Sequence, residues 1–493
     1  MENQHVLIVT LGSQGQLNPA RRLAVQLSRL SFSGRITLAI PLHFFRRLFP
    51  SSPPNQPQPL PGPPSPHQIF FSSFSDGCDD GFDPNTGDGH LFMVKFKKVG
   101  SQTLSTLIRN LSSQGHPVTG IIYTIILSWV PDIAGEFNIP SFFYWIQPAS
   151  VFSIYYHYFT VFKDLTKTQL PGLPPLSSKD LPSLLSNPTS DPYLPDFELI
   201  FKTLNKTKTK VLVNSFTALE SGVISSLSDK LELLTIGPLV DDDEDVSLYE
   251  HDDSDNYMQW LDSKEEGSIV YLSFGSLSVL SEKQVEEILK GLEESGRPFL
   301  WVLRKNNRGQ GIDEKLIKKI NYEERGKVVG WCSQVKVLKH SSVGCFVSHC
   351  GWNSMSEGLL AGVPMVMVPQ WMDQMTNARL GEAEWRVGVR VEVEEDGMVT
   401  GEELRRCLEV VMGGEEISEG VEIRKRAAFW KDKALEALGQ DDDDDDDGSS
   451  IPEDHLLFRF SVSDLSIPRL TATPLLFRLS ISFSTSVSAA PSH

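Results

Sequence analysis

Short apolar runs and helix-period segments alternate along most of this chain, and this alternation restricts its fold more than any other feature of the sequence. Parallel strands need a long crossover connection, usually a helix, so the alternation predicts a parallel sheet covered by helices. The expected strands are residues 6–11, 36–40, 69–73, 120–126, 211–214, 267–274, 298–303, 327–329, 344–348 and 365–368, and the expected helices include residues 282–295 and 354–361. The sequence therefore predicts an α/β protein.

An acidic, polar stretch at residues 237–256 interrupts the alternation, which restarts after it. This composition predicts a solvated linker, and a chain of 493 residues is too long for one hydrophobic core. We therefore expect two domains, residues 1–236 and 257–440, with a cleft between them. Residues 441–493 begin with an acidic run and then lack a helical period, which predicts a disordered, atypical tail. The proline-rich residues 50–66 predict a surface loop without regular structure.

The net charge of the chain indicates which classes of binding partner to expect, and the number and spacing of its cysteines indicate the cellular compartment. A formal net charge of −19 argues against binding to nucleic acid or to an anionic membrane surface. The five cysteines are dispersed and odd in number, which predicts reduced thiols and a cytoplasmic setting. No apolar run is long enough to span a bilayer, and no signal peptide is apparent at residues 1–5. No heptad seam or apolar stripe is visible, so we expect a monomer that is not inserted in a membrane.

The first strand leads into a glycine turn, "LGSQGQLNP", at residues 11–19. The pattern predicts a helix that begins at Pro19 with Asn18 as its N-cap. Such a turn lies at the carboxyl edge of a parallel sheet, where open α/β folds bind ligands. The turn exposes Gln16, an amide that cannot take up a proton near neutral pH. No G-x-G-x-x-G follows Leu11, so a dinucleotide-dependent dehydrogenase is disfavoured.

Special residues are densest in the segment from Trp331 to Gln374. A buried strand ending at His349 is followed by a turn and by a helix opened by Asn353 and Ser354. The free N–H groups of a helix N-terminus after a parallel strand suit a phosphate.

Two further residues of this segment suit the rest of a nucleotide. Glu357, one turn into the helix, can accept hydrogen bonds from a diol such as a ribose, and Trp331 offers a flat face to a base. Taken singly, these residues also fit ordinary capping and core roles, but together they predict a nucleotide site. Cys345, His349 and Cys350 lack a second pair of ligands, so a buried strand is favoured over a metal site.

Over its whole length, the segment from Trp331 to Gln374 resembles the signature box of plant family 1 UDP-glycosyltransferases, and the resemblance extends from about residue 6 to residue 438. It implies a GT-B fold of two Rossmann-like domains facing a central cleft, the first binding an acceptor and the second UDP-glucose as co-substrate. The residues implied at the donor are Trp331 stacked on uracil, the Cys332 backbone at the edge of the base, Gln334 and Glu357 at the ribose, Ser276, His349, Asn353 and Ser354 at the diphosphate, and Trp352, Asp373 and Gln374 at the sugar.

The resemblance also refines the donor and the subgroup. Gln374 at the last position of the box favours glucose over galactose. No metal or other cofactor is expected, because fixed dipoles and His349 would replace the cation at the leaving diphosphate. Residues 74–82, 121–137 and 145–159 are similar to a subgroup of anthocyanin 5-O-glucosyltransferases, crocetin glucosyltransferases and indole-3-acetate glucosyltransferases.

The chain departs from the family at the catalytic pair. In the family a His in the pattern G-H-x-x-P removes the acceptor proton and an Asp orients that His, but here Gln16 and Thr124 occupy these positions. A phenol ionises with a pKa of about 10, so losing the base would cost roughly 10²–10⁴ in rate, whereas a carboxylic acid with a pKa of about 4 arrives ionised.

Three hypotheses follow from this departure. The favoured one is an inverting UDP-glucosyltransferase that glucosylates a carboxylate of a small lipophilic metabolite. The second has phenolic or flavonoid hydroxyls as acceptors, with another group or water as the base. The third is a UDP-sugar-binding homologue with impaired catalysis.

Overall fold

The computed structural model describes residues 4–439 except 30–33, 55, 61–67, 84–86, 163, 166–168, 187, 189–190, 208, 240–255 and 305–324. The expectations for residues 441–493, for most of the acidic linker and for part of the proline-rich loop lie outside the described residues.

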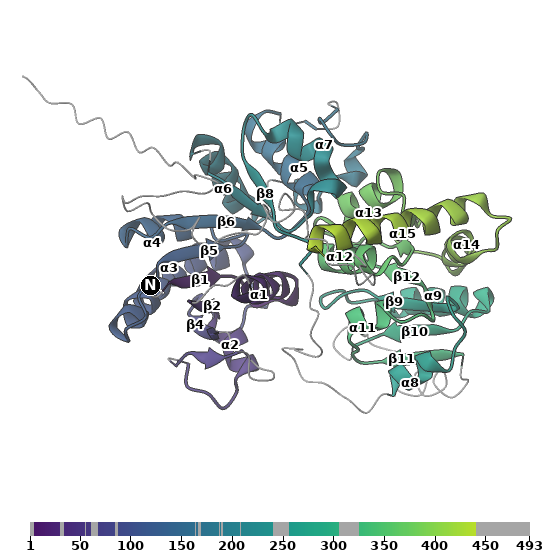
Figure 1. Ribbon diagram of the computed structural model, residues 1–493, viewed down its shortest axis with the longest axis horizontal. Coiled ribbons are helices and arrows are strands. Elements are labelled where there is room, and N and C mark those ends of the chain that lie inside the picture. The colour runs from purple at the N-terminus through teal and green to yellow at the C-terminus, as the bar shows by residue number, and fades with distance from the viewer. Residues whose placement is uncertain are drawn as a thin grey trace, which may run out of the picture.

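The predicted α/β class is confirmed, because the chain forms two sheets flanked by helices (Figure 1). The first sheet has the strand order β3-β4-β2-β1-β5-β6-β7-β8, and the second has the order β11-β10-β9-β12-β13-β14. Adjacent strands pair in parallel except for β3 and β4. In each sheet the chain starts at a central strand, β1 or β9, adds strands on one side of it and then continues on its other side. This is the doubly wound arrangement of Rossmann-like folds.

The first sheet and its helices run from residue 5 to residue 235. Their bounds are β1 His5–Val9, α1 Gln14–Arg29, β2 Arg35–Pro41, α2 Leu42–Leu48, β3 Gln58–Pro59, β4 Gln68–Phe74, α3 Gly89–Ser113, β5 Gly120–Tyr123, α4 Val130–Glu136, β6 Ser141–Trp145, α5 Ala149–Thr160, the 3-10 turns η1 Ser178–Asp180 and η2 Ser183–Leu185, α6 Leu194–Thr207, β7 Val211–Val213, α7 Thr217–Leu227 and β8 Leu233–Thr235.

The second sheet and its helices run from residue 257 to residue 438. Their bounds are α8 Tyr257–Asp262, β9 Ile269–Ser273, α9 Glu282–Ser295, β10 Phe299–Val302, β11 Gly326–Val329, α11 Gln334–Leu338, β12 Val343–Ser348, α12 Trp352–Ala361, β13 Met365–Met367, α13 Gln374–Ala383, β14 Gly388–Arg390, α14 Gly401–Met412 and α15 Ser418–Leu438.

All ten predicted strands are present, with ends that differ by up to three residues. The largest difference is in β5, which ends at Tyr123 because the chain leaves the extended conformation, with Ile126 at a φ of 67°. Four strands were not predicted, namely β3, β6, β8 and β14. The expectation that the proline-rich loop has no regular structure was wrong at Gln58–Pro59, where β3 adds antiparallel to the sheet edge. An edge position tolerates the missing N–H of proline.

The predicted start of the first helix was wrong. Helix α1 begins at Gln14, so Pro19 lies inside it and Asn18 is not its N-cap. The carbonyl of Ser13 accepts hydrogen bonds from the backbone N–H of Gln16 at 3.0 Å and of Leu17 at 2.8 Å, which starts the helix five residues early. The glycine turn is therefore shorter than expected, and Gln16 lies in the first turn of α1.

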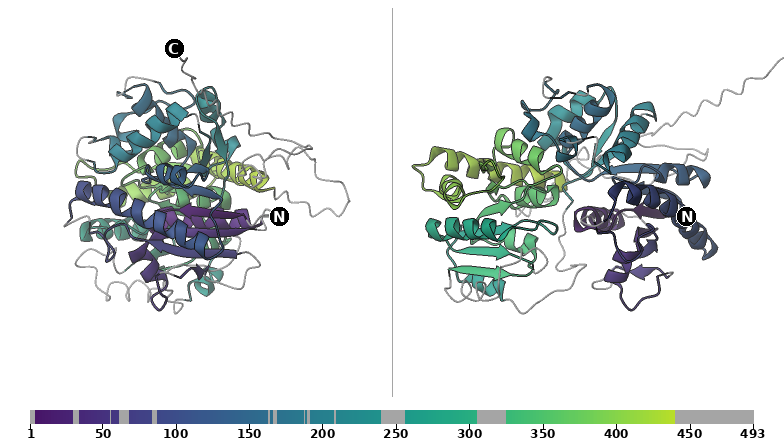
Figure 2. Two further views of the ribbon diagram at one scale, coloured as in Figure 1. Left: turned by 90° about the vertical axis from the view of Figure 1, so that its left-hand side faces the viewer. Right: turned by 180° about the vertical axis from the view of Figure 1, so that it is seen from behind.

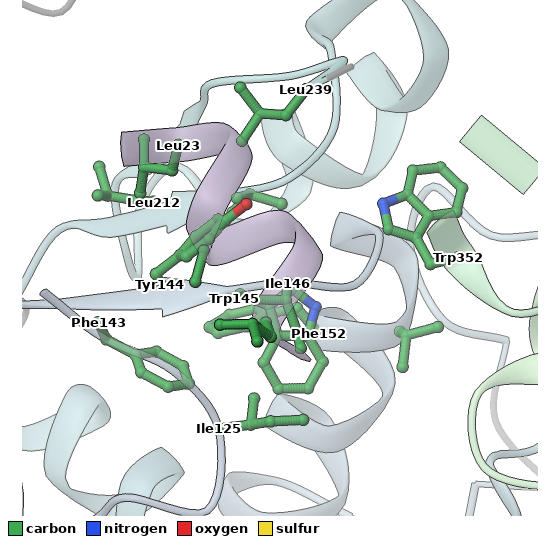
Figure 3. Close-up of a cluster of buried hydrophobic side chains, with 14 of the residues drawn as sticks. Leu23, Ile125, Phe143, Tyr144, Trp145, Ile146, Phe152, Leu212, Leu239 and Trp352 are labelled. Atoms are coloured by element: carbon green, nitrogen blue, oxygen red, sulfur yellow. The ribbon is translucent and has the colours of Figure 1, made fainter. Parts of the chain in front are cut away.

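One buried cluster connects the two halves of the molecule. Trp145 of β6 packs edge-on against Phe152 of α5 at 5.5 Å and Phe201 of α6 at 5.7 Å between ring centroids. The same cluster reaches Trp352 of α12 in the second half (Figure 3). Helix α15 also packs on α7 of the first half, where the two bodies meet (Figures 1 and 2).

Candidate active site

The carboxyl edges of both sheets line one cavity of about 780 Å³ between the two halves. The reversals of strand order, between β1 and β5 and between β9 and β12, both lie at this cavity. The predicted site residues that line it are Gln16, Ser276, Trp331, Cys332, Gln334, His349, Trp352, Asn353, Ser354, Glu357, Asp373 and Gln374. The remaining one, Thr124, is fully buried at the end of β5 behind Gln16.

Gln16 and Thr124, predicted at the positions of the catalytic pair, lie together. The Thr124 hydroxyl donates to Oε1 of Gln16 at 3.2 Å and lies 3.1 Å from the hydroxyl of Thr10. An amide and two hydroxyls can exchange hydrogen bonds, but none of them accepts a proton near neutral pH. This cluster therefore positions the wall of the cavity and supplies no general base.

The turn between β12 and α12 presents a helix N-terminus to the cavity. Strand β12 ends at Ser348, as in its predicted range, and α12 begins at Trp352, two residues before its predicted start, with Gly351 as the N-cap. No side chain caps this helix. The first backbone N–H groups of α12, including those of Asn353 and Ser354, have no partner inside the helix, so this end attracts an anion.

His349 is wedged between two glycine backbones at this turn. A Cβ added to Gly275 or to Gly351 would lie 2.6 Å from Nε2 of His349, so only glycine allows the ring to sit there. Desolvation lowers the pKa of His349 to about 4. His349 is thus neutral near pH 7 in the ligand-free protein, so its part in the expected replacement of a cation would be that of a hydrogen-bond donor, beside the positive potential of the α12 N-terminus.

A hydrogen-bonded network joins three elements of the second half. The amide nitrogen of Gln334 donates to Ser354 Oγ at 2.9 Å and to Glu357 Oε2 at 2.7 Å, while its amide oxygen accepts from the Tyr271 hydroxyl at 3.2 Å. The Cys332 thiol lies 3.4 Å from the same hydroxyl, and burial raises its pKa to about 12. The network holds an amide and a carboxylate side by side, which suits a pair of neighbouring hydroxyls.

Two buried contacts from the first half reach this network and its helix. Arg22 of α1 forms an ion pair with Glu357, and both side chains are almost fully buried. The indole N–H of Trp352 donates to the carbonyl of Asn214. Sequence reasoning missed Arg22, although an arginine on the buried side of an amphipathic helix is an unusual residue that must find a partner.

A third contact between the halves follows from Pro19 inside α1. Proline has no N–H, so the carbonyl of Gly15 four residues earlier is left without its helical partner. The Asn353 side chain of α12 donates to this carbonyl at 3.4 Å. The carbonyl left free by Pro19 therefore connects the first turn of α1, which carries Gln16, to the N-terminus of α12.

Asp373 and Gln374 close the cavity at the start of α13. Asp373 accepts a hydrogen bond from Asn377 at 2.7 Å, and burial raises the pKa of Asp373 to about 6. The amide oxygen of Gln374 accepts from the backbone N–H groups of Gln370 at 2.9 Å and Trp371 at 3.1 Å. Gln374 thus keeps its NH₂ group available as a donor.

Comparison with known proteins decides the family. Residues 234–440 match the family described as UDP-glucoronosyl and UDP-glucosyl transferase. The chain is 42% identical over 467 residues to a chloroplastic crocetin glucosyltransferase of Gardenia jasminoides, which covers 90% of this chain and 95% of that protein. It is 41% identical over 460 residues to an anthocyanidin 3-O-glucoside 5-O-glucosyltransferase of Perilla frutescens, covering 90% and 96%.

The chain belongs to the plant UDP-glycosyltransferases. Among solved structures it is similar to Os79 of O. sativa in complex with UDP, with a TM-score of 0.76, 28% identity and coverage of 94% of this chain and 100% of that one. The protein is therefore a UDP-dependent glycosyltransferase with a GT-B fold, and its similarity to the predicted subgroup is confirmed.

The first half gives this glycosyltransferase an aromatic wall opposite the donor side. Phe82 and Phe92 stack at 4.4 Å, and Phe92 and Phe96 stack at 5.7 Å between ring centroids. Ile125 and Tyr193 extend the same wall. A cavity of this composition favours a flat, lipophilic acceptor.

Two polar residues of this wall, His43 and Asp76, were missed from the sequence. Nδ1 of His43 lies 3.5 Å from Oδ2 of Asp76, and both residues line the cavity. Each follows the end of a parallel strand by two residues, and this position at the carboxyl edge is the signal that could have found them.

Two further properties concern the part of the chain that the structure describes. Its helices include none with the length and apolar composition needed to cross a bilayer. It also contains no group of three or more His, Cys, Asp or Glu residues placed to hold a metal ion.

Proposed function

We propose that this glycosyltransferase moves glucose from UDP-glucose, with inversion of the anomeric carbon, to a small lipophilic metabolite. The observation that carries the proposal is the cavity itself, which has the uncapped N-terminus of α12 on one side and the aromatic wall on the other. An anion-binding helix end beside an apolar pocket matches a reaction in which a diphosphate leaves as a lipophilic acceptor attacks.

The donor roles in this proposal follow the positions of the side chains. The first turn of α12, with Ser276 and a neutral His349, would hold the diphosphate. Glu357 and Gln334 would bind the ribose hydroxyls, and Trp331 would stack on uracil above the Cys332 backbone. Trp352, Asp373 and Gln374 would contact the sugar, Asp373 as an acceptor for its hydroxyls and Gln374 as a donor through its NH₂ group.

The acceptor class follows from Gln16. Because Gln16 and Thr124 cannot take up a proton, an acceptor that is already ionised loses least, and this favours a carboxylate that becomes a glucose ester. Phenolic hydroxyls remain acceptors if another group accepts their proton. The relatives are named for transfer to crocetin and to an anthocyanidin glucoside, so the subgroup spans more than one acceptor.

The test measures transfer and binding separately. Purified protein is incubated with UDP-glucose or UDP-galactose and with an aromatic carboxylic acid or a flavonoid phenol, and glucosides are detected by mass spectrometry. We expect transfer from UDP-glucose, with the carboxylic acid as an accepted substrate. Calorimetry gives the affinity for UDP independently. Binding of UDP without transfer to either acceptor would overturn the proposal in favour of an impaired UDP-sugar-binding homologue.

A further inference from the structure

The first sheet brings together, at its carboxyl edge, the segments that follow four of its strands, namely two loops and the first turns of α1 and α2. Its strand order contains β4-β2-β1-β5, so the residues that follow these strands, Asp76, His43, Gln16 and Thr124, succeed one another along the edge. Neighbouring strands lie about 4.8 Å apart. His43 therefore belongs to the turn next to the one that carries Gln16, on the side away from Thr124.

The side chain of Phe44, next to His43 in α2, packs against the backbone at Gly12, which lies just before α1. A Cβ on Gly12 would lie 1.9 Å from Cγ of Phe44, so the start of α2 packs directly on the chain between β1 and α1. The rings of His43 and Phe44 lie 3.9 Å apart. Both of these residues line the same cavity as Gln16 and the N-terminus of α12.

Asp76 is buried, and a backbone hydrogen bond holds its carboxylate close to His43. Its side chain is 3% exposed, and its Oδ1 accepts a hydrogen bond from the backbone N–H of Cys78 at 2.8 Å. Its other oxygen, Oδ2, faces Nδ1 of His43 at 3.5 Å. Nδ1 makes no hydrogen bond at this distance, and catalytic hydrogen bonds are often long or poorly aligned before a substrate binds. If Nδ1 pairs with the carboxylate when a substrate binds, Nε2 is the nitrogen of His43 that remains for an acceptor.

We propose that His43 is the general base for hydroxyl acceptors and that Asp76 is its positioning residue. The inference rests on the proposed glucosyl transfer and supplies the proton acceptor that Gln16 cannot be. Imidazole can accept a proton near neutral pH, and a carboxylate on its other nitrogen stabilises the cation that forms. The aromatic wall that includes Phe82 and Phe92 would hold the acceptor ring beside it.

The proposed step balances as a single displacement. Nε2 of His43 takes the proton of the acceptor hydroxyl, and the acceptor oxygen forms a bond to the anomeric carbon of glucose. The bond between that carbon and the phosphate oxygen breaks, and UDP leaves with the electron pair toward the N-terminus of α12. A carboxylate acceptor brings no proton, so its transfer does not need His43.

The experiment compares the two acceptor classes in full-length protein. His43→Gln should lower kcat for the flavonoid phenol by roughly 10²–10⁴, with kcat for the carboxylic acid and the affinity for UDP changed less than about threefold. Added imidazole should partly restore phenol transfer by His43→Ala. His340→Gln is the matched control, because His340 also pairs with an aspartate, Asp262 at 3.1 Å, but lies outside the residues that line the cavity.

The other outcomes overturn the inference in distinguishable ways. Phenol transfer that persists in His43→Gln, equal losses on both acceptors, or a wild type that accepts only the carboxylic acid would each contradict it. Failure of the wild type on both acceptors would instead remove the proposed function, and the inference with it. If His43→Gln does not fold, Asp76→Asn decides, with an expected loss of about tenfold or more on the phenol alone.

Discussion

The donor side and the acceptor side of the cavity are built on sheets of similar strand order, but they are assembled differently. On the donor side, most contacts come from one continuous segment of residues 331–374, whose side chains bond to one another through Gln334, Ser354 and Glu357. On the acceptor side, the polar groups come from four turns spread over residues 16–124. Local sequence therefore encodes the donor side, whereas the pairing of distant strands creates the acceptor side.

The comparison also shows where substitution is tolerated. On the donor side the His349 ring lies directly against the backbone of Gly275 and Gly351, so a side chain at either glycine would displace it. The hydrogen bonds of Gln334 to Ser354 and Glu357 likewise depend on these particular side chains. The acceptor edge holds several polar side chains that follow neighbouring strands, so a substitution at one of them leaves other polar groups at the cavity. Under the proposal that His43 is the base, this difference would account for Gln16 at the family base position in a chain whose donor side retains the family pattern.

The largest expected effect comes from moving the proposed base from His43 on the acceptor side to position 16, where the family has its His. In a His43→Gln background, Gln16→His should recover phenol transfer by about 10² or more, because it restores an imidazole next to the acceptor hydroxyl. Adding Thr124→Asp should increase the recovery, since the Thr124 hydroxyl already contacts the side chain at position 16. The measurement is kcat for a flavonoid phenol. No recovery in either variant would show that position 16 no longer faces the acceptor.

The second prediction breaks the contact between the two sides. Arg22→Met should leave the buried Glu357 carboxylate without its cation and lower the free energy of unfolding by about 3–5 kcal/mol. Lys202→Met removes a solvent-exposed pair with Glu198 and serves as the control, with an expected change of about 0.3–0.5 kcal/mol. Urea denaturation compares both with the wild type. Similar changes in the two variants would show that the Arg22 pair is effectively solvated.

The third prediction tests the tight backbone of the donor side. Gly351→Ala places a Cβ 2.6 Å from Nε2 of His349, so the ring or the first turn of α12 must move. We expect kcat to fall by about 10², the cost of losing a preorganised hydrogen-bond donor at a developing anion. Gly135→Ala is the control, because a Cβ there meets no atom within 4 Å. Loss of activity in Gly351→Ala on both acceptor classes would separate this effect from that of His43.

The smallest expected effect is a pH dependence of sugar binding. Burial raises the pKa of Asp373 to about 6, so the carboxylate that would accept sugar hydroxyls is protonated at lower pH. KM for UDP-glucose should rise below pH 6 by at most about tenfold per pH unit, whereas the affinity for UDP should not follow. Asp373→Asn should remove this dependence. A wild-type KM that does not change between pH 7 and pH 5 would contradict the assigned role.

Lower pH, which should weaken sugar binding through Asp373, should instead increase the stability of the folded protein. Its pKa in the folded protein is higher than the ordinary 3.8, so folding favours the protonated form. Its contribution to stability is complete below that ordinary pKa and is lost as the pH rises through 6, by roughly 3 kcal/mol at most. Asp373→Asn should therefore unfold at a higher temperature than the wild type at pH 7, which calorimetry can measure.

The accuracy of the sequence-based predictions differs between elements for physical reasons. Helix α9 was predicted at its observed bounds, because Ser281 caps its start, Gly296 ends it and a regular apolar face lies between them. Strands β8 and β14 were missed, whereas β7 and β13 of the same length were predicted, because β7 and β13 are wholly apolar and β8 and β14 each contain a polar residue. The start of α1 was predicted too late because proline signals the first turn of a helix more often than its interior.

The strand, turn and helix start within residues 331–374 pointed to His349, Asn353, Ser354, Glu357 and Trp331, whereas the other donor-side residues were named through the resemblance to the family. The sequence alone also determined the α/β class, through its alternation, and the absence of a basic side chain at position 16. Only the tertiary structure brought His43 and Asp76 to the cavity that Gln16 also lines and paired Arg22 with Glu357. These pairs depend on which strands lie next to each other and on how the two halves pack, and both are decided by burial of apolar surface over the whole chain.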